Sequence, residues 1–184
     1  MRVAYIDIET NYVGKYGYRD DRFFRDSKNH LITVLGVRVL AGKDDGFFQL
    51  VGADVKKSEL MKILKGVRRL ITYNGRSIPD DLKGRVGFDF PVIAAQLGVV
   101  LDREFPHTDL VPECWRRNLY GGLKQVEQAL GLKRELPGKH GAWAMETWRA
   151  FEKSGDKKHL EELLLYNKED VFMLRRIERK LRTM

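Results

Sequence analysis

The 184-residue chain is 43% hydrophobic and 33% charged, which indicates a folded globular protein and excludes an intrinsically disordered one. Its 34 lysines and arginines against 26 acids give a formal charge of +8, which favours a polyanionic partner such as nucleic acid. No apolar run could span a bilayer, and the single cysteine, Cys114, excludes an internal disulfide. We therefore expect one cytoplasmic domain over residues 1–184, without membrane contact.

The spacing of apolar residues predicts a mixed α/β sheet of about five strands, flanked by helices. The first three strands follow one another as hairpins do, so we expect them to be antiparallel. The expected strands cover residues 2–9, 31–40, 46–51, 69–73 and 104–107. The expected helices cover residues 55–67, 89–99, 109–119, 122–130, 142–153 and 157–182.

Residues 10–30 follow neither the strand period nor the helix period, and aromatic side chains are interleaved there with lysines and arginines. Aromatic rings among cations suit stacking on single-stranded bases. Alternatively, several of these rings fold back onto the core. We interpret the stretch as a substrate-side segment, and the residues expected to contact substrate are Thr10, Tyr12, Tyr16 and, at the turn after the fourth strand, Asn74.

Two acids, Asp7 and Glu9, lie in the first expected strand, within Y-I-D-I-E-T. Side chains of a strand alternate between its faces, so both acids share one face and Ile6 and Ile8 share the other. An unpaired buried charge costs several kcal/mol. These acids therefore need a partner, which is solvent, a basic side chain or a cation.

Two further acids could converge with this pair. Asp89 precedes an apolar helical run, and its alternative role is to cap that helix. Asp170 lies in the middle of the last helix, beside the apolar stripe and one turn after Tyr166. Its alternative is a solvated position on the flank of that helix.

In this order, Y-I-D-I-E-T, Y-N-G…F-D-F-P and Y-N-K-E-D-V resemble the three motifs of the DEDD exonuclease superfamily, which has a ribonuclease H-like fold. The Tyr166-x-x-x-Asp170 spacing resembles its tyrosine branch, because Leu165 occupies the position where the histidine branch has histidine. L-I-T-Y-N-G, H-T-D-L and G-G-L-K-Q-V-E-Q-A-L-G-L resemble the small stand-alone exonuclease domains of bacteria and archaea. The resemblance covers residues 2–178.

The resemblance implies phosphodiester hydrolysis with two divalent cations, Mg²⁺ or Mn²⁺, held by carboxylates. Asp7 would bridge both ions, Glu9 and Asp170 would hold the one that activates water, and Asp89 would support the other. Tyr166 would orient the attacking water. The implied activity is 3′–5′ exonuclease action on single-stranded ends, with DNA favoured over RNA. The alternatives are a structure-selective endonuclease on the same fold and a catalytically silent nucleic-acid-binding module.

The chain departs from the family pattern between its Asn-Gly turn and Asp89, where Arg76 to Gly87 intervene. This insertion contains Asp80 and Asp81, but the helical run that follows favours Asp89 as the second-motif acid. We interpret the insertion as a surface excursion and Asp109 as a helix cap. The arginines of the last helix are either a phosphate-binding face or a solvated face, and we favour the latter for Arg175, Arg176, Arg179 and Arg182.

Overall fold

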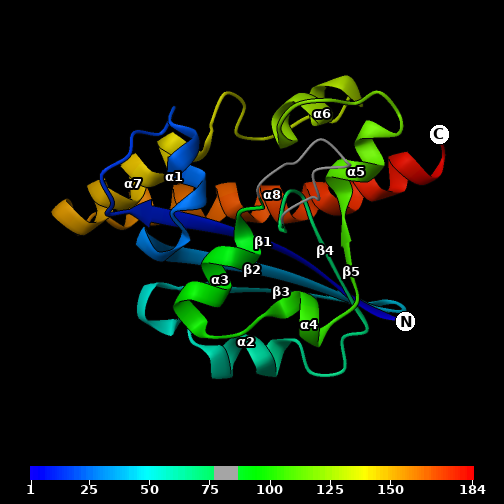
Figure 1. Cartoon of the computed structure of the whole chain (residues 1–184), viewed down its shortest axis with the longest axis horizontal. Coiled ribbons are helices and arrows are strands. Elements are labelled where there is room, and N and C mark those ends of the chain that lie inside the picture. The colour runs from blue at the N-terminus through cyan, green and yellow to red at the C-terminus, as the bar shows by residue number, and fades with distance from the viewer. Residues whose placement is uncertain (77–86) are drawn as a thin grey trace.

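The computed structural model describes residues 1–76 and 87–184, so Asp80, Asp81 and most of the insertion lie outside the described residues. Its centre is a five-stranded mixed sheet with the order β3-β2-β1-β4-β5 (Figure 1). The first three strands are antiparallel, whereas β4 runs parallel to β1 and β5 parallel to β4. The mixed α/β fold is the one that the sequence predicts. The strands are β1 (Arg2–Tyr12), β2 (His30–Ala41), β3 (Asp44–Val51), β4 (Arg69–Thr72) and β5 (His107–Asp109).

Helices cover both faces of the sheet (Figure 1). The α-helices are α1 (Asp21–Arg25), α2 (Lys57–Ile63), α3 (Asp89–Leu97), α4 (Leu101–Glu104), α5 (Leu110–Trp115), α6 (Leu123–Ala129), α7 (Gly141–Ser154) and α8 (Lys157–Arg182). Two short 3-10 turns occupy Ser27–Asn29 and Gly52–Asp54. In the described part of the chain, no helix is both long enough and apolar enough to cross a membrane.

The alternation of β1 side chains divides the core into two layers. Ile6 and Ile8 pack in one apolar cluster with residues of α2 and α3, whereas Tyr5 packs in another with residues of α5 and α8. Because side chains two apart share a face, Asp7 and Glu9 lie on the Tyr5 side, facing α8. The strand period thus directs both acids toward the helix that carries Asp170.

Two sequence expectations were wrong in detail. Residues 10–30 are not irregular throughout, because β1 continues to Tyr12 and α1 follows; Tyr12 and Phe23 are buried with Met145 in a small apolar cluster. The expected strand at 104–107 is displaced, because Leu101 is fully buried and anchors a helical turn through Glu104. Pro106 has no amide hydrogen and gives the sheet only its carbonyl, which accepts from the Leu70 amide at 2.9 Å.

Candidate active site

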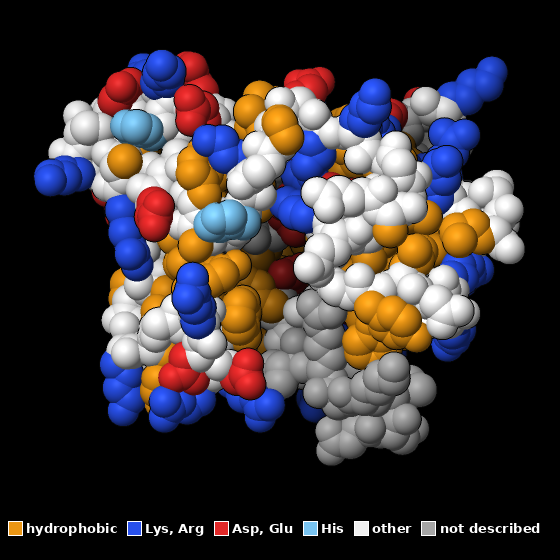
Figure 2. Space-filling view, turned by 90° about the horizontal axis from the view of Figure 1, so that it is seen from above, with side chains coloured by type: hydrophobic (Ala, Val, Ile, Leu, Met, Phe, Trp, Pro, Cys, Tyr) orange, Lys and Arg blue, Asp and Glu red, His pale blue; other side chains and the backbone are white. Residues whose placement is uncertain are grey.

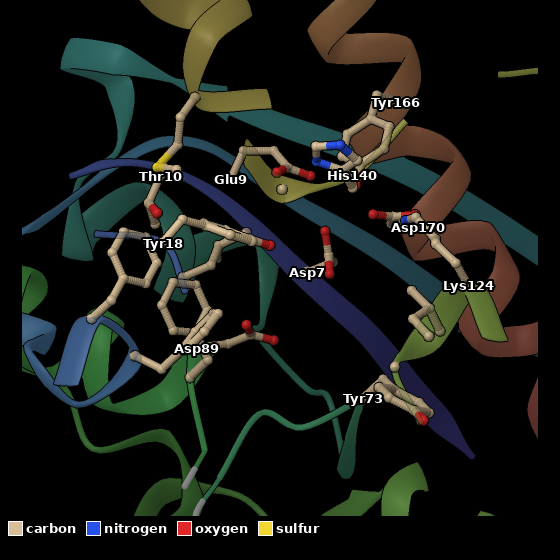
Figure 3. Close-up of a pocket in the computed structure, with 18 of the residues that line it drawn as sticks. Asp7, Glu9, Thr10, Tyr18, Tyr73, Asp89, Lys124, His140, Tyr166 and Asp170 are labelled. Atoms are coloured by element: carbon tan, nitrogen blue, oxygen red, sulfur yellow. The ribbon is translucent and has the colours of Figure 1, made fainter. Parts of the chain in front are cut away.

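Three carboxylates form the floor of the site. Asp7 and Glu9 extend from the central strand β1, and Asp170 extends from the middle of α8. One oxygen from each lies within 4.8 Å of the others, and the close-up shows the three groups facing a common space (Figure 3). The register shift of the β1–β2 pairing falls between Glu9 and Thr10, so a β-bulge marks the end of the acid pair.

Asp89 is the fourth acid of the same cavity. It opens α3 but does not cap it, because Phe88 is the N-cap residue and no side chain makes a capping bond there. Asp89 is only 5% exposed, and its Oδ2 has no hydrogen-bond partner among the described residues. A buried carboxylate oxygen without a partner is costly, so the fold leaves an acceptor that a ligand could satisfy.

The turn at Asn74 holds the start of α3 in position. The backbone carbonyl of Asn74 accepts from the Phe88 amide at 2.9 Å, and that of Gly75 accepts from the Phe90 amide at 2.7 Å. Asp109 in turn accepts from the Asn74 amide at 2.9 Å and from the Val111 amide at 3.0 Å. Asp109 is therefore the α5 cap that the sequence predicts, and it also braces the turn that positions Asp89.

Burial and crowding disfavour ionisation of Asp7, Glu9 and Asp89. Burial, and next the charge of Asp170, raise the pKa of Asp7 well above its ordinary range. Burial and then the charges of Asp7 and Asp170 raise the pKa of Glu9 in the same direction, and burial followed by Asp7 raises the pKa of Asp89. In the absence of a bound cation, the site holds more acid than its own basic groups neutralise.

Two basic side chains reach Asp170, and sequence reasoning missed both. Lys124 of α6 and Arg134 each form an ion pair with Asp170 Oδ1. Arg134 also bonds Glu127, with Nη2 2.6 Å from Oε1. Its side chain is 8% exposed, so the buried ion pairs hold it in a fixed position. Lys124 lines the cavity itself, and its Nζ lies 4.5 Å from the centroid of the Tyr166 ring.

Asn167 positions Asp7 from α8. Its amide nitrogen donates to Asp7 Oδ2 at 3.1 Å and to the Asp7 carbonyl at 3.3 Å, while its own oxygen accepts from Gln49 at 3.0 Å. Gly36, the β2 partner of Asp7, makes room for this amide, because a Cβ there would lie 2.3 Å from Asn167 Oδ1. In the sequence, Asn167 lies within the motif Y-N-K-E-D-V, three residues before Asp170 and so on the same side of the helix.

Tyr166 lies one turn before Asp170 and lines the cavity. It is 3% exposed and packs against Trp143, with ring centroids 5.4 Å apart. Burial, followed by the charge of Asp170, raises the pKa of Tyr166 far above its ordinary value, so the hydroxyl keeps its proton. Among the described residues this hydroxyl makes no hydrogen bond and is available to a water or a substrate.

The cavity above the acids has a volume of about 440 Å³ and two unlike ends. Figure 2 shows acid side chains at the bottom of a hollow on this face. Toward α1 and α3 the lining includes the rings of Tyr18, Phe24 and Phe88, with Met145 from α7; toward α6 it includes Lys124, on the same side as Tyr73 in Figure 3. Aromatic lining around a small cavity suits a planar ring, such as a base.

The residues expected to touch substrate fall into two groups. Thr10 lines the cavity, with its hydroxyl 3.0 Å from His30 Nδ1. Tyr12, Tyr16 and Asn74 are not among the described residues that line it. Tyr12 is 6% exposed and donates its hydroxyl to Asp26 at 2.7 Å, so its ring packs inward as the alternative interpretation held. Tyr18, six residues further along the chain, lines the cavity wall instead.

The donor set matches a hard divalent cation. The converging atoms are all carboxylate oxygens, which Mg²⁺ and Mn²⁺ prefer, and no cysteine or histidine joins the described cluster. A cation would offset the burial and repulsion that raise the pKa values of Asp7, Glu9 and Asp89. The unpartnered Oδ2 of Asp89 would gain a ligand, directly or through water. The residues present therefore fit divalent metal.

Fold and site together define an α/β protein with an acidic, metal-competent centre on the middle strand of a mixed sheet. A sequence model of the RNase_H superfamily matches residues 4–182, and the chain belongs to that superfamily. This membership indicates a metal-dependent nuclease, a hydrolase that acts on nucleic acid. A comparison with curated proteins found no match.

Proposed function

We propose that the chain is a 3′–5′ exonuclease of the tyrosine branch, acting over residues 1–184 as one domain on single-stranded ends, and on DNA in preference to RNA. The observation that carries this proposal is the convergence of four acids and Tyr166 on one cavity. Asp7, Glu9, Asp89 and Asp170 would hold two divalent ions, Mg²⁺ or Mn²⁺. A cytoplasmic location stays a prediction.

The bound ions would supply a nucleophilic water at neutral pH and neutralise charge on the phosphate that is attacked. The side chains of this chain set the geometry for that chemistry. Asn167 fixes the Asp7 carboxylate through two hydrogen bonds, and Arg134 fixes Asp170 from the protein interior. The protonated Tyr166 hydroxyl faces the cavity, where it can hold a water in line with the phosphorus.

The aromatic end of the cavity supports exonuclease over endonuclease action. A terminal nucleoside can insert its base among Tyr18, Phe24 and Phe88, with the next phosphate over the acids. An internal base would reach the same place only with strand continuing on both sides. Tyr18 is 38% exposed and so is accessible to a stacked base.

Cleavage of a 5′-labelled single strand tests the proposal. DNA and RNA of one sequence would be incubated with Mg²⁺, Mn²⁺ or EDTA and wild type, Asp7→Asn, or the surface control Asp45→Asn. A metal-dependent ladder of shortening products, lost only in Asp7→Asn, is the expected result, and the faster ladder identifies the sugar. Discrete internal fragments would replace the exonuclease with the endonuclease alternative. Binding without cleavage in every metal would leave a silent binding module.

A further inference from the structure

A second cavity adjoins the active site. It has a volume of about 510 Å³ and lies between α6 and the connection from α6 to α7, which Figure 1 shows passing along the outer edge of the molecule. Lys124 and His140 line both this cavity and the catalytic one, so the two spaces meet at these side chains. The second cavity, called the basic groove below, is lined by Lys124, Lys133, Arg134, Lys139 and His140 among others.

The charge of the basic groove is almost entirely positive. Among its described lining residues the one acid is Glu127, which is 1% exposed and already bound by Arg134 at 2.6 Å. Lys133 is exposed, and neither Lys133 nor Lys139 forms an ion pair in the described part of the chain. Lys139 Nζ lies 4.2 Å from the centroid of the Trp143 ring, a contact that leaves its charge without a neutralising partner. Exposed Glu135 lies two residues after Lys133 and lines a neighbouring cavity with it, but the groove itself has more basic than acidic side chains, and such a surface attracts polyanions.

We propose that the basic groove binds the backbone of the substrate strand 5′ to the scissile phosphate and carries it away from the active site. This inference rests on the proposed function. The catalytic cavity has an aromatic end, which suits the terminal base, and an end at Lys124, which opens into the groove. A strand whose last base occupies the aromatic end therefore leaves over Lys133 and Lys139.

The basic groove would bind the phosphates of the strand and would not distinguish its bases. Lysines bind phosphates as point charges, and contacts to phosphate position a strand without distinguishing its bases. Lys139 already covers the ring of Trp143, so that ring offers less of its face to a base. The groove therefore adds affinity that is independent of sequence, depends on salt and grows with strand length.

Binding measured in EDTA separates the groove from catalysis. The variant is Lys133→Ala/Lys139→Ala, and the matched control is Lys57→Ala/Lys65→Ala, which removes two exposed lysines at α2 and just after it. Lys124 stays intact because it touches Asp170. A labelled octanucleotide and a dinucleotide would be titrated at several salt concentrations, and both would then be cleaved with Mg²⁺.

Loss of two phosphate contacts should make the negative slope of log K against log salt shallower by about 1.4. It should also weaken octanucleotide binding about 20-fold at 0.1 M salt. Dinucleotide cleavage should match that of the control, because a dinucleotide does not reach the groove. Equal octanucleotide affinity and salt slope in variant and control would overturn the groove while wild-type cleavage still upheld the nuclease. If wild type neither bound nor cut either oligonucleotide, the proposed function itself would fail, and the groove with it.

Discussion

Two buried carboxylate groups on α8 lie about two turns apart, and their surroundings are opposite. Asp170 and Glu178 are each 5% exposed. Every acceptor position around Glu178 is filled, since Oε1 binds Arg182 at 2.6 Å and Arg69 at 3.1 Å. Its Oε2 accepts from the Tyr5 hydroxyl at 2.5 Å and from Arg175 at 3.3 Å.

Around Asp170, in contrast, acidic groups outnumber basic groups. Two basic groups, Lys124 and Arg134, face a group of four acids, and Arg134 shares its charge with Glu127. Burial, together with this excess of negative charge, raises the pKa values of Asp7, Glu9 and Asp89. Because one helix carries both groups, burial alone does not distinguish a structural acid from a functional one. The distinction lies in whether the protein completes the neutralisation or leaves it to a ligand.

The largest expected effect comes from the acids around Asp170, whose charge the protein does not fully neutralise. Asp7→Asn keeps the shape of the side chain but removes a shared metal ligand, and it should lower kcat/KM of nuclease cleavage by about 10³-fold or more. The same change removes repulsion, so the free energy of unfolding of the metal-free protein should rise. Thermal melts in EDTA and cleavage rates in Mg²⁺ check the two halves. An active Asp7→Asn protein would show that Asp7 holds no essential cation.

Substitution of Glu178, whose charge the protein does neutralise, should lower stability and leave activity unchanged. Glu178→Gln leaves Arg69, Arg175 and Arg182 around an uncharged side chain and should lower the free energy of unfolding by about 3 kcal/mol. For a domain of this size the melting temperature would fall by about 9 °C. Activity per folded molecule should stay that of wild type. Glu161→Gln, an exposed position on the same helix, is the control. A loss of activity in Glu178→Gln without a loss of stability would show that Glu178 has a functional role and is not only structural.

The pH dependence of the metal-free protein sharpens the comparison. The pKa of Glu9 is raised in the folded state, so the unfolded chain ionises first. Its contribution is therefore most favourable below the unfolded pKa and is lost as pH rises through the folded pKa. Relative to wild type in EDTA, Glu9→Gln should gain stability as the pH rises above the ordinary pKa of a glutamate. Mg²⁺ should raise the stability of wild type and reduce that gain. If the difference in stability between Glu9→Gln and wild type did not change with pH, the folded state would not raise the pKa of Glu9.

Sequence patterns predicted the fold and the shared face of Asp7 and Glu9, but they did not predict the contrast between Asp170 and Glu178. The two-residue period of β1 places Asp7 and Glu9 on one face, and the apolar stripe of α8 follows from its spacing. Those are local patterns, and the five-stranded α/β sheet confirms the fold that they indicate. The roles of the four acids and Tyr166 stay predictions.

The partners that neutralise the acids could not be predicted in the same way. Arg134 reaches Asp170 from a segment 36 residues away in sequence, and Tyr5 reaches Glu178 from 173 residues away. Such pairs depend on how the elements pack, and no period within one element reports them. Arg175 shows the same limit, because it binds Tyr5 and Glu178, whereas its sequence pattern favoured a solvated face. Arg182 also binds Glu178, but its side chain is 59% exposed, in agreement with that expectation.

The smallest expected effect concerns the support of the acid group. Gly36→Ala introduces a methyl group that would lie 2.3 Å from Asn167 Oδ1 and 2.8 Å from Val171 Cγ2, so Asn167 must shift. Because Asn167 holds Asp7, we expect kcat to fall about 10-fold, with a loss of about 1 kcal/mol of stability. Gly17→Ala is the control, since a Cβ there meets nothing within 4 Å. Single-turnover cleavage together with thermal melting measures both effects. If Gly36→Ala lost stability but kept full kcat, Asn167 would contribute to packing only, and Asp7 would hold its position without it.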